Sequence, residues 1–324
     1  MRRNDTPDRG PLLESIQSGT WEDYLQTLHR HFFEHHQSRC LVWINPAQGD
    51  PFSDVALEEQ RKIVVPIEHA KFDRKFAPYL IDLRLDKFRD AEIFKLSVEM
   101  AWEAWSEPSL AARAGQPICG WIGVDGDPKE LSEHWAKRCH VHLVATRHKF
   151  LRFHDPGVRE LLWTFLTPVQ KAILTANTSA IFSIGRRRNL LKQTLAEMQP
   201  SLDSPTRSLV LDTVQWSYVA DLANIHAASV VLHTELGTSL NDLPVGMSIF
   251  RALEHATHYG ILDESNRQLF IRHVLEAGSE FHHDDRLKRV WSLTQSGEFY
   301  GVALQDVLEC EPDQFKNYLS QHFA

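Results

Sequence analysis

Apolar side chains three or four positions apart open the regular part of the chain after residue 19. Over residues 20–37 this spacing predicts an amphipathic helix with Thr20 as its N-cap. Short runs of consecutive apolar residues follow, which are typical of buried strands. Residues 40–44, 62–67, 79–85 and 118–124 are the runs that predict strands. Between the third and fourth strands, helical spacing returns over residues 93–105.

Residues 140–170 predict a hairpin followed by two helices. Residues 140–145 and 149–153 resemble a pair of antiparallel strands. Asp155-Pro156 and Thr167-Pro168 each place a capping residue before a proline, as at a helix N-terminus. The strand signal fades after residue 170, and residues 189–198 predict a helix. Most of the remaining chain also predicts helices, most clearly residues 249–260 and 263–278.

These patterns predict an α/β (α+β) chain with two lobes. We expect a loose tail over residues 1–19 and an α/β domain over residues 20–185, in which a mixed sheet is flanked by helices. An all-helical C-terminal domain is expected over residues 186–324. A length of 324 residues suits two hydrophobic cores better than one.

Composition and charge narrow the class of protein. Hydrophobic residues make up 43% of the chain and charged residues 24%, as in ordinary globular proteins. The formal net charge of −8 argues against nucleic acid or an anionic membrane as partner, because both need a positive field. No apolar run is long enough for a signal peptide or a membrane helix, so we expect a cytoplasmic protein. The four cysteines form no C-x-x-C pair and are expected to be free thiols.

One segment fits a catalytic pattern. In His31-Phe-Phe-Glu34-His35 the two histidines would share a helix face and bind zinc, while Glu34 activates water, as in H-x-x-E-H hydrolases. The pattern fixes only three positions in a chain with 18 histidines, and no third ligand is evident, so a solvated helix face is the competing interpretation. Glycine loops for phosphate and a G-x-S-x-G nucleophile are missing. The sequence therefore favours a protein that is not an enzyme and has no cofactor or metal site.

Two groups of residues are candidates for binding a partner protein. Trp102 and Trp105 lie three positions apart on a predicted helix, and aromatic side chains are frequent in binding hot spots. Core packing is the competing interpretation for both. Arg186, Arg187 and Arg188 form a basic run that is too short for a nucleic-acid footprint but suits an acidic protein surface.

The segment from Phe150 to Val158, followed by Leu-Thr-Pro-Val-Gln at residues 166–170, resembles the signature of the type VI secretion effector adaptors, the Tap/Tec chaperones. In that family a strand of the form L-x-R-F-x-D-P-R-V leads into a helix and an L-x-P-x-Q turn. The matching residues are Leu151, Arg152, Phe153, Asp155, Pro156 and Val158. Gly157 stands where the family has an arginine. The resemblance spans roughly residues 20–185, with weaker support over 245–295.

The resemblance implies a cytosolic chaperone that holds a toxic effector and assists its loading onto the VgrG spike, without catalysis. It also implies a structural role for the matched residues. Asp155 would accept backbone N–H groups at the helix start, and Pro156 would fit the first turn. Two alternatives stay open. The first is a zinc-dependent hydrolase using His31, Glu34 and His35, and the second is a regulatory or scaffolding protein unconnected with secretion.

Overall fold

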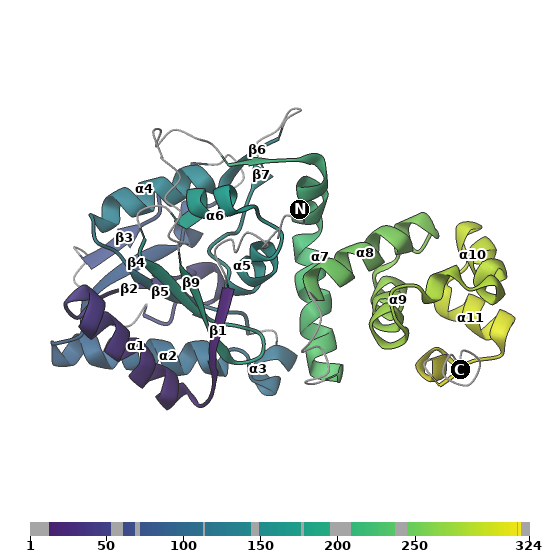
Figure 1. The fold of residues 1–324 in the computed structure, drawn as a ribbon, viewed down its shortest axis with the longest axis horizontal. Helices are drawn as coiled ribbons and strands as arrows, with labels where there is room; N and C mark the ends of the chain where they lie inside the picture. The colour runs from purple at the N-terminus through teal and green to yellow at the C-terminus, as the bar shows by residue number, and fades with distance from the viewer. Residues whose placement is uncertain are drawn as a thin grey trace, which may run out of the picture. The chain divides into compact units, whose positions relative to one another are not determined.

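The computed structural model describes residues 13–52, 61–68, 72–112, 114–143, 149–175, 178–194, 209–236, 245–315 and 317–318 (Figure 1). The chain forms two compact units, Met1–Ala220 and Asp221–Ala324. The boundary between them falls within one long helix, α7 (Thr213–Leu236).

A seven-stranded sheet forms the centre of the first unit, with the strand order β1-β9-β8-β5-β2-β4-β3. Every pairing in it is antiparallel. Its strands are β1 (Leu13–Ser18), β2 (Arg39–Ile44), β3 (Lys62–Val64), β4 (Tyr79–Arg84), β5 (Ile118–Gly123), β8 (Ala180–Ile184) and β9 (Asn189–Thr194). A three-stranded sheet adds β6 (His140–Leu143), β7 (Lys149–Phe150) and β10 (Val210–Leu211), in which β10 runs parallel to β6.

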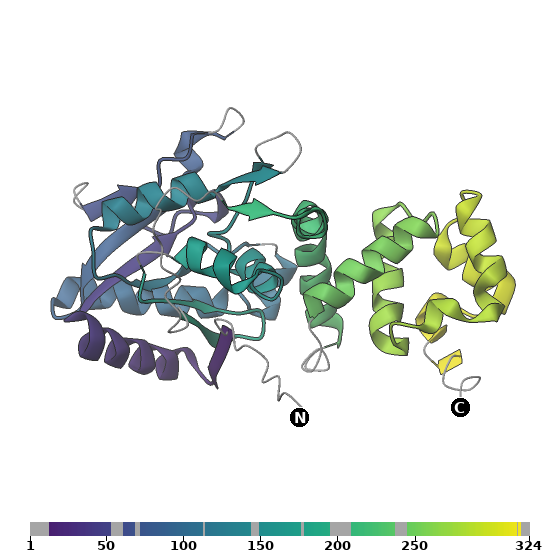
Figure 2. The same cartoon turned by 45° about the horizontal axis from the view of Figure 1, so that its top comes forward.

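Helices cover both faces of the large sheet, because alternate strand residues point to opposite sides and both sets are apolar. On one side, α1 (Trp21–His36) and α2 (Phe88–Glu103) lie next to each other (Figures 1 and 2). Trp121 of β5 faces this side and donates its indole N–H to Ser97 Oγ of α2 at 2.8 Å. On the other side, Trp43 of β2 stacks on Trp135 of α4 (Pro128–Arg138), with ring centroids 4.0 Å apart. The remaining helices of this unit are α3 (Glu107–Ala111), α5 (Pro156–Trp163) and α6 (Pro168–Thr175), with 3-10 turns η1 (Pro46–Gln48) and η3 (Arg74–Phe76).

The second unit is helical over its described residues. It contains α8 (Val245–His258), α9 (Glu264–Ala277), α10 (Lys288–Gln295) and α11 (Tyr300–Leu308), with 3-10 turns η5 (Phe281–His283), η6 (Asp285–Leu287) and η7 (Pro312–Gln314). Aromatic rings fill its core. Trp291 of α10 stacks on Tyr300 of α11 at 5.8 Å, and Phe270 of α9 lies edge-on to Trp291 at 6.0 Å.

The expected fold class is confirmed, and four details differ from the sequence-based expectations. Residues 13–18, expected in a loose tail, form strand β1, and residues 189–194, expected to be helical, form strand β9 between β1 and β8. The compact units divide after Ala220, whereas the patterns placed the boundary after residue 185. Among the described strands, parallel and antiparallel pairings occur together only in the small sheet, where β10 runs parallel to β6 and β7 runs antiparallel to it. In each case long-range pairing, which local patterns do not report, decides the outcome. Over the described residues, no helix is long and apolar enough to cross a membrane.

Candidate functional site

The segment that carries the family resemblance forms a buried corner between β7 and α5. Leu151 and Phe153 both lie in the core. The carboxylate of Asp155 accepts hydrogen bonds from the backbone N–H groups of Gly157 at 3.0 Å and Val158 at 3.2 Å. Its second oxygen binds Arg152 at 2.7 Å. The helix cap that the Asp-Pro pair indicates is therefore present.

Arg159 ties this corner to the large sheet, and the sequence patterns did not single it out. Its side chain is fully buried and donates hydrogen bonds to the carbonyls of Phe153, His154 and Cys119 of β5. Burial lowers the pKa of Arg159 to about 10. An arginine within the stretch from residue 158 to 163, which is apolar except for Arg159 and Glu160, was the available signal. These contacts are internal to the fold, so the corner has a structural role.

The two tryptophans proposed as partner-binding residues lie in different environments. Trp105 is only 2% exposed and donates its indole N–H to the carbonyl of Ile184 at 3.1 Å. It belongs to the core, because a ring buried in this way has no face left for a partner. Trp102 is partly exposed, and the guanidinium of Arg188 lies 3.0 Å from its ring centre.

The three arginines of the basic run also lie in different environments. Arg186 is 8% exposed, forms an ion pair with Glu160 at 3.1 Å and donates to the carbonyl of Gly157, so it is committed inside the fold. Arg187 is exposed. Arg188 approaches Glu103 at 3.8 Å and covers Trp102. Of the five partner-binding candidates, the structure brings Trp102 and Arg188 together at the surface, leaves Arg187 exposed, and places Trp105 and Arg186 in the interior.

The histidine pattern on α1 lacks a ligand set in the described part of the chain. The rings of His31 and His35 are 4.8 Å apart, and His31 packs edge-on against Phe182 of the sheet. Burial, followed by the charge of Lys192, lowers the pKa of His31 to about 4. Among the described residues, no group of three His, Cys, Asp or Glu side chains could hold a metal ion. The arrangement therefore gives the zinc-hydrolase alternative no support.

A neighbouring histidine forms a contact that resembles part of a catalytic triad. His36 Nε2 lies 3.1 Å from Ser179 Oγ, and its Nδ1 lies 3.7 Å from a carboxylate oxygen of Asp125. The Asp125 side chain is 85% exposed, and 3.7 Å is too long for an orienting hydrogen bond. The N–H of Ser179 is already donated to the carbonyl of Gly123, so it does not serve as an oxyanion donor. The contact joins the end of α1 to the start of β8.

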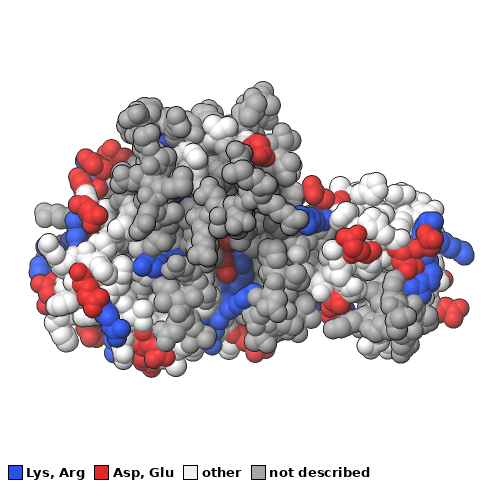
Figure 3. Space-filling view, viewed as in Figure 1, with Lys and Arg blue, Asp and Glu red and all other residues white. Residues whose placement is uncertain are grey.

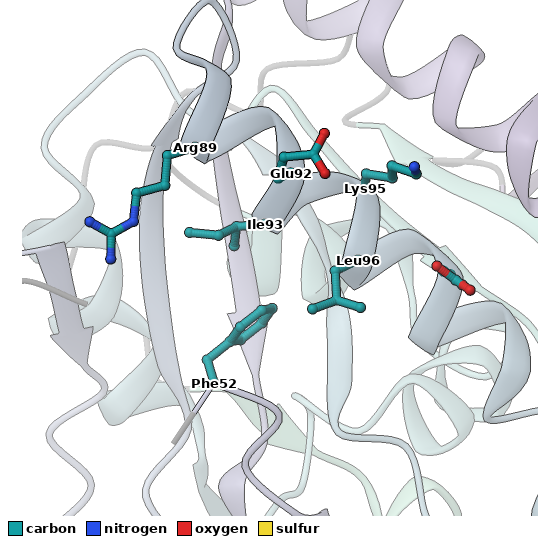
Figure 4. Close-up of a pocket in the computed structure, with 7 residues that line it drawn as sticks. Phe52, Arg89, Glu92, Ile93, Lys95 and Leu96 are labelled. Carbon is teal, nitrogen blue, oxygen red and sulfur yellow. The ribbon is translucent and has the colours of Figure 1, made fainter. Parts of the chain in front are cut away.

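The described surface of the first unit is hollowed along the line where α1 and α2 meet. One hollow of about 650 Å³ is lined from α1 by His29, Arg30 and Phe33, and from α2 by Glu92 and Lys95, among others. An adjoining hollow of about 340 Å³ is drawn in Figure 4. It is lined by Phe52 and by α2 residues that include Arg89, Glu92, Lys95, Leu96 and Glu99. Glu92 and Lys95 line both hollows and lie on the ridge of α2 that separates them; we call the larger hollow, between α1 and α2, the α1–α2 groove.

The groove combines exposed apolar side chains with charged ones. Phe33, in the groove, is 65% exposed, and Leu96, in the smaller hollow, is 40% exposed. Among the described residues, Arg30, Glu92 and Lys95 form no ion pair within 4.0 Å. On the face seen in Figure 3, acidic and basic side chains of the described residues intermingle. Aromatic side chains and arginine, such as Phe33 and Arg30, are enriched at protein-binding surfaces.

The sequence patterns missed this groove, although a signal existed. Phe33 follows Phe32, and adjacent helix residues cannot face the same side, so one of the two rings had to lie off the buried stripe. Leu96 similarly lies off the stripe formed by Phe94, Val98 and Ala101.

Comparison with known proteins adds one finding. No curated protein and no solved structure matches the chain. Residues 68–172, which contain α2, the buried corner and most of α6, match the family model described as Domain of unknown function (DUF4123).

Proposed function

We propose that this protein is a cytoplasmic adaptor that binds a type VI secretion effector and assists its loading onto the VgrG spike. The DUF4123 family is associated with effector adaptors of this secretion system, and residues 68–172 match its model. The Leu-Arg-Phe-x-Asp-Pro segment at residues 151–156 resembles the same adaptors.

The observation that carries the proposal is the α1–α2 groove. A ring as exposed as that of Phe33, in the hollow between α1 and α2, is costly to leave in water unless another molecule covers it. The surrounding charges would give such a contact direction and specificity. We therefore assign the groove to the effector. Trp102 with Arg188 is a second candidate contact, because a tryptophan stacked under a guanidinium is common at interfaces.

A binding role also accounts better for the histidines than hydrolysis does. A zinc ligand must keep a ring nitrogen directed at the metal. The ring of His31 instead packs edge-on against Phe182, and among the described residues no group of three potential ligands forms around it.

Co-expression tests the proposal. The full chain, carrying an affinity tag, is produced together with the toxin encoded beside it and, separately, with the VgrG protein of the same gene cluster. We expect a stable complex with the toxin that survives size-exclusion chromatography. Elution of the chain with neither protein would contradict the proposal.

Export in the native bacterium gives an independent test. Deletion of the gene should abolish secretion of one effector, while secretion of other proteins by the same apparatus continues. Unchanged export of every effector would favour a scaffolding protein unconnected with secretion.

A further inference from the structure

Three histidines meet in the second unit, where helix α8 contacts turn η5. The ring of His282, in η5, lies 4.1 Å from the ring of His255 in α8 and 4.1 Å from the ring of His283, measured between centroids. His282 is 2% exposed, whereas His255 is partly exposed and His283 is exposed. The Nδ1 atom of His282 lies 3.2 Å from the hydroxyl of Tyr259, the residue that follows α8. The middle ring of the cluster is therefore buried between two others.

The buried histidine lies where η5 is joined to α8 and α10. Trp291 of α10 donates its indole N–H to the carbonyl of His282 at 3.0 Å and stacks on Tyr259, with ring centroids 4.3 Å apart. Thr294 of α10 donates its hydroxyl to the carbonyl of Tyr259 at 2.7 Å. The side chains that α9 and α10 direct toward Tyr259 are Phe270 and Trp291, which have no charge. A displacement of His282 would therefore loosen η5 from both α8 and α10.

The surroundings of His282 favour its neutral form. Burial, followed by the neighbouring His255 and His283, lowers the pKa of His282 to about 4. The carboxylate of Glu280 and the backbone of Ser279 act in the opposite direction, but their effects are smaller. At neutral pH the buried ring is therefore uncharged, and it packs against its neighbours without repulsion.

The pKa of His255 is shifted in the same direction. Burial is the largest cause, and the charge of His283 adds to it. Glu254 and Glu280 oppose this shift, while His258 adds a smaller lowering effect. Acidification thus brings protons to both partners of a stacked pair.

The acidic residues near the cluster do not compensate a charge on His282. Glu280 lies 3.5 Å from Nε2 of His283, the exposed member. Asp284 and Asp285 each form an ion pair with a basic residue two or three positions further on, at 2.9 Å and 2.8 Å. Among the described residues, no carboxylate lies within 4.0 Å of a ring nitrogen of His282. A proton added to this ring would have no anion beside it.

We propose that the stacked pair of His255 and His282 is an acid-sensitive latch, in which the neutral rings hold η5 against α8 and α10 and protonation of His282 releases it. Two imidazolium rings at this separation repel each other, and a buried imidazolium lacks the hydration that it has in water. The latch lies within the second unit and does not depend on the proposed function.

The size of the expected response follows from the pKa of His282 in the closed and opened states. This pKa is about 4 in the closed state and returns to its ordinary value of 6.5 when the segment opens. The opened state therefore binds the proton more tightly, so the latch is stable at neutral pH and loses stability as the pH falls from 6.5 toward 4. From His282 alone, the opening equilibrium should increase about 30-fold between pH 7.5 and pH 5.

Hydrogen exchange of the full chain, followed by mass spectrometry and corrected for the intrinsic pH dependence of amide exchange, measures this opening. Amides of residues 255–260 and 281–291 should open about 30-fold more at pH 5 than at pH 7.5. His282→Phe keeps a ring at this position but binds no proton, so most of the increase should disappear. Amides of β2, β4 and β5 in the first unit should respond equally in both proteins. A pH-independent opening of the unmodified chain, or equal increases in the two proteins, would overturn the inference.

A second variant gives the answer if His282→Phe does not fold. His255→Phe changes a partly exposed site, keeps a ring against His282 and removes the neighbouring charge. The acid-induced increase should then fall to about half or less, because the pKa of His282 moves back toward 6.5. The matched control His258→Gln removes an exposed histidine from the same helix and should leave the increase unchanged. An equal increase in His255→Phe and His258→Gln would contradict the latch.

Discussion

The Arg159 guanidinium gives the sharpest test of how the buried corner is held. Its hydrogen bonds to three buried carbonyls, each with a charged donor, are worth roughly 6 kcal/mol together. Burying the charge offsets about 3 kcal/mol of this, because burial lowers the pKa of Arg159 from 12.5 to about 10 and each pKa unit corresponds to about 1.4 kcal/mol. Arg159→Met should therefore lower the free energy of unfolding of the first unit by about 3 kcal/mol.

Urea denaturation of the full chain, followed by tryptophan fluorescence, measures this difference. Trp43 reports directly, since the guanidinium lies 5.2 Å from its ring centre. Arg159→Lys keeps the charge but loses the planar fork that reaches both the corner and β5, so it should be at least as destabilising. Hydrogen exchange should show faster exchange at the amides of residues 151–158 in both variants. A loss below about 1 kcal/mol for the methionine variant would refute the reasoning, since it is less than one charged hydrogen bond contributes.

Three further expectations concern the cap, the buried histidines and the thiols. Asp155→Ala removes two capping hydrogen bonds and the Arg152 contact, and should lower the unfolding free energy by about 2 kcal/mol in urea titration; an unchanged midpoint would contradict the capping role. Burial lowers the pKa of His154 to about 4, so between pH 6.5 and about 4 the unfolded chain binds a proton that the folded chain does not. Stability should therefore fall as the pH falls through this window, and His154→Phe should reduce that slope; equal slopes for both proteins would exclude His154 as a source. The four cysteines are buried and free, and burial raises the pKa of the Cys40 and Cys119 thiols. A thiol reagent should therefore react far more slowly with native protein than with protein unfolded in urea. Rapid stoichiometric labelling of the native protein would disprove this.

The elements that local patterns predicted are those whose periodicity is unambiguous. Helices α1 and α2 and strands β2, β4 and β5 each have a clear stripe or a compact apolar run bounded by turn residues. Strand β9 was missed because Leu190 and Leu191, adjacent in the chain, are both buried. A strand covered on both faces shows no alternation, so its pattern does not distinguish it from a helix. Strand β9 is recognisable only through its pairing with β1 and β8. Strand β1 lies far from it in the sequence, and local patterns predicted neither β1 nor β8 as a strand.

The candidate site was less predictable than the fold. Trp102 and Trp105 share a face only if the helix continues, but α2 ends at Glu103 and Trp105 turns into the core. In the basic run, Arg188 has a φ of 55°, so its side chain leaves the turn in a different direction from that of Arg186. The α1–α2 groove depends on which sides of two helices meet, and this is set by tertiary packing.

The strand order of the large sheet has a practical consequence for any attempt to isolate the segment that matches the family model. Strands β4 and β5 both lie within residues 68–172, yet they never touch: β2 separates them, β3 completes the outer side of β4, and β8 completes the far side of β5. All three of these neighbours are encoded outside the segment. A protein trimmed to the recognisable stretch would thus expose four unsatisfied strand edges and invite aggregation. The smallest piece worth expressing starts before β1 and runs past β10.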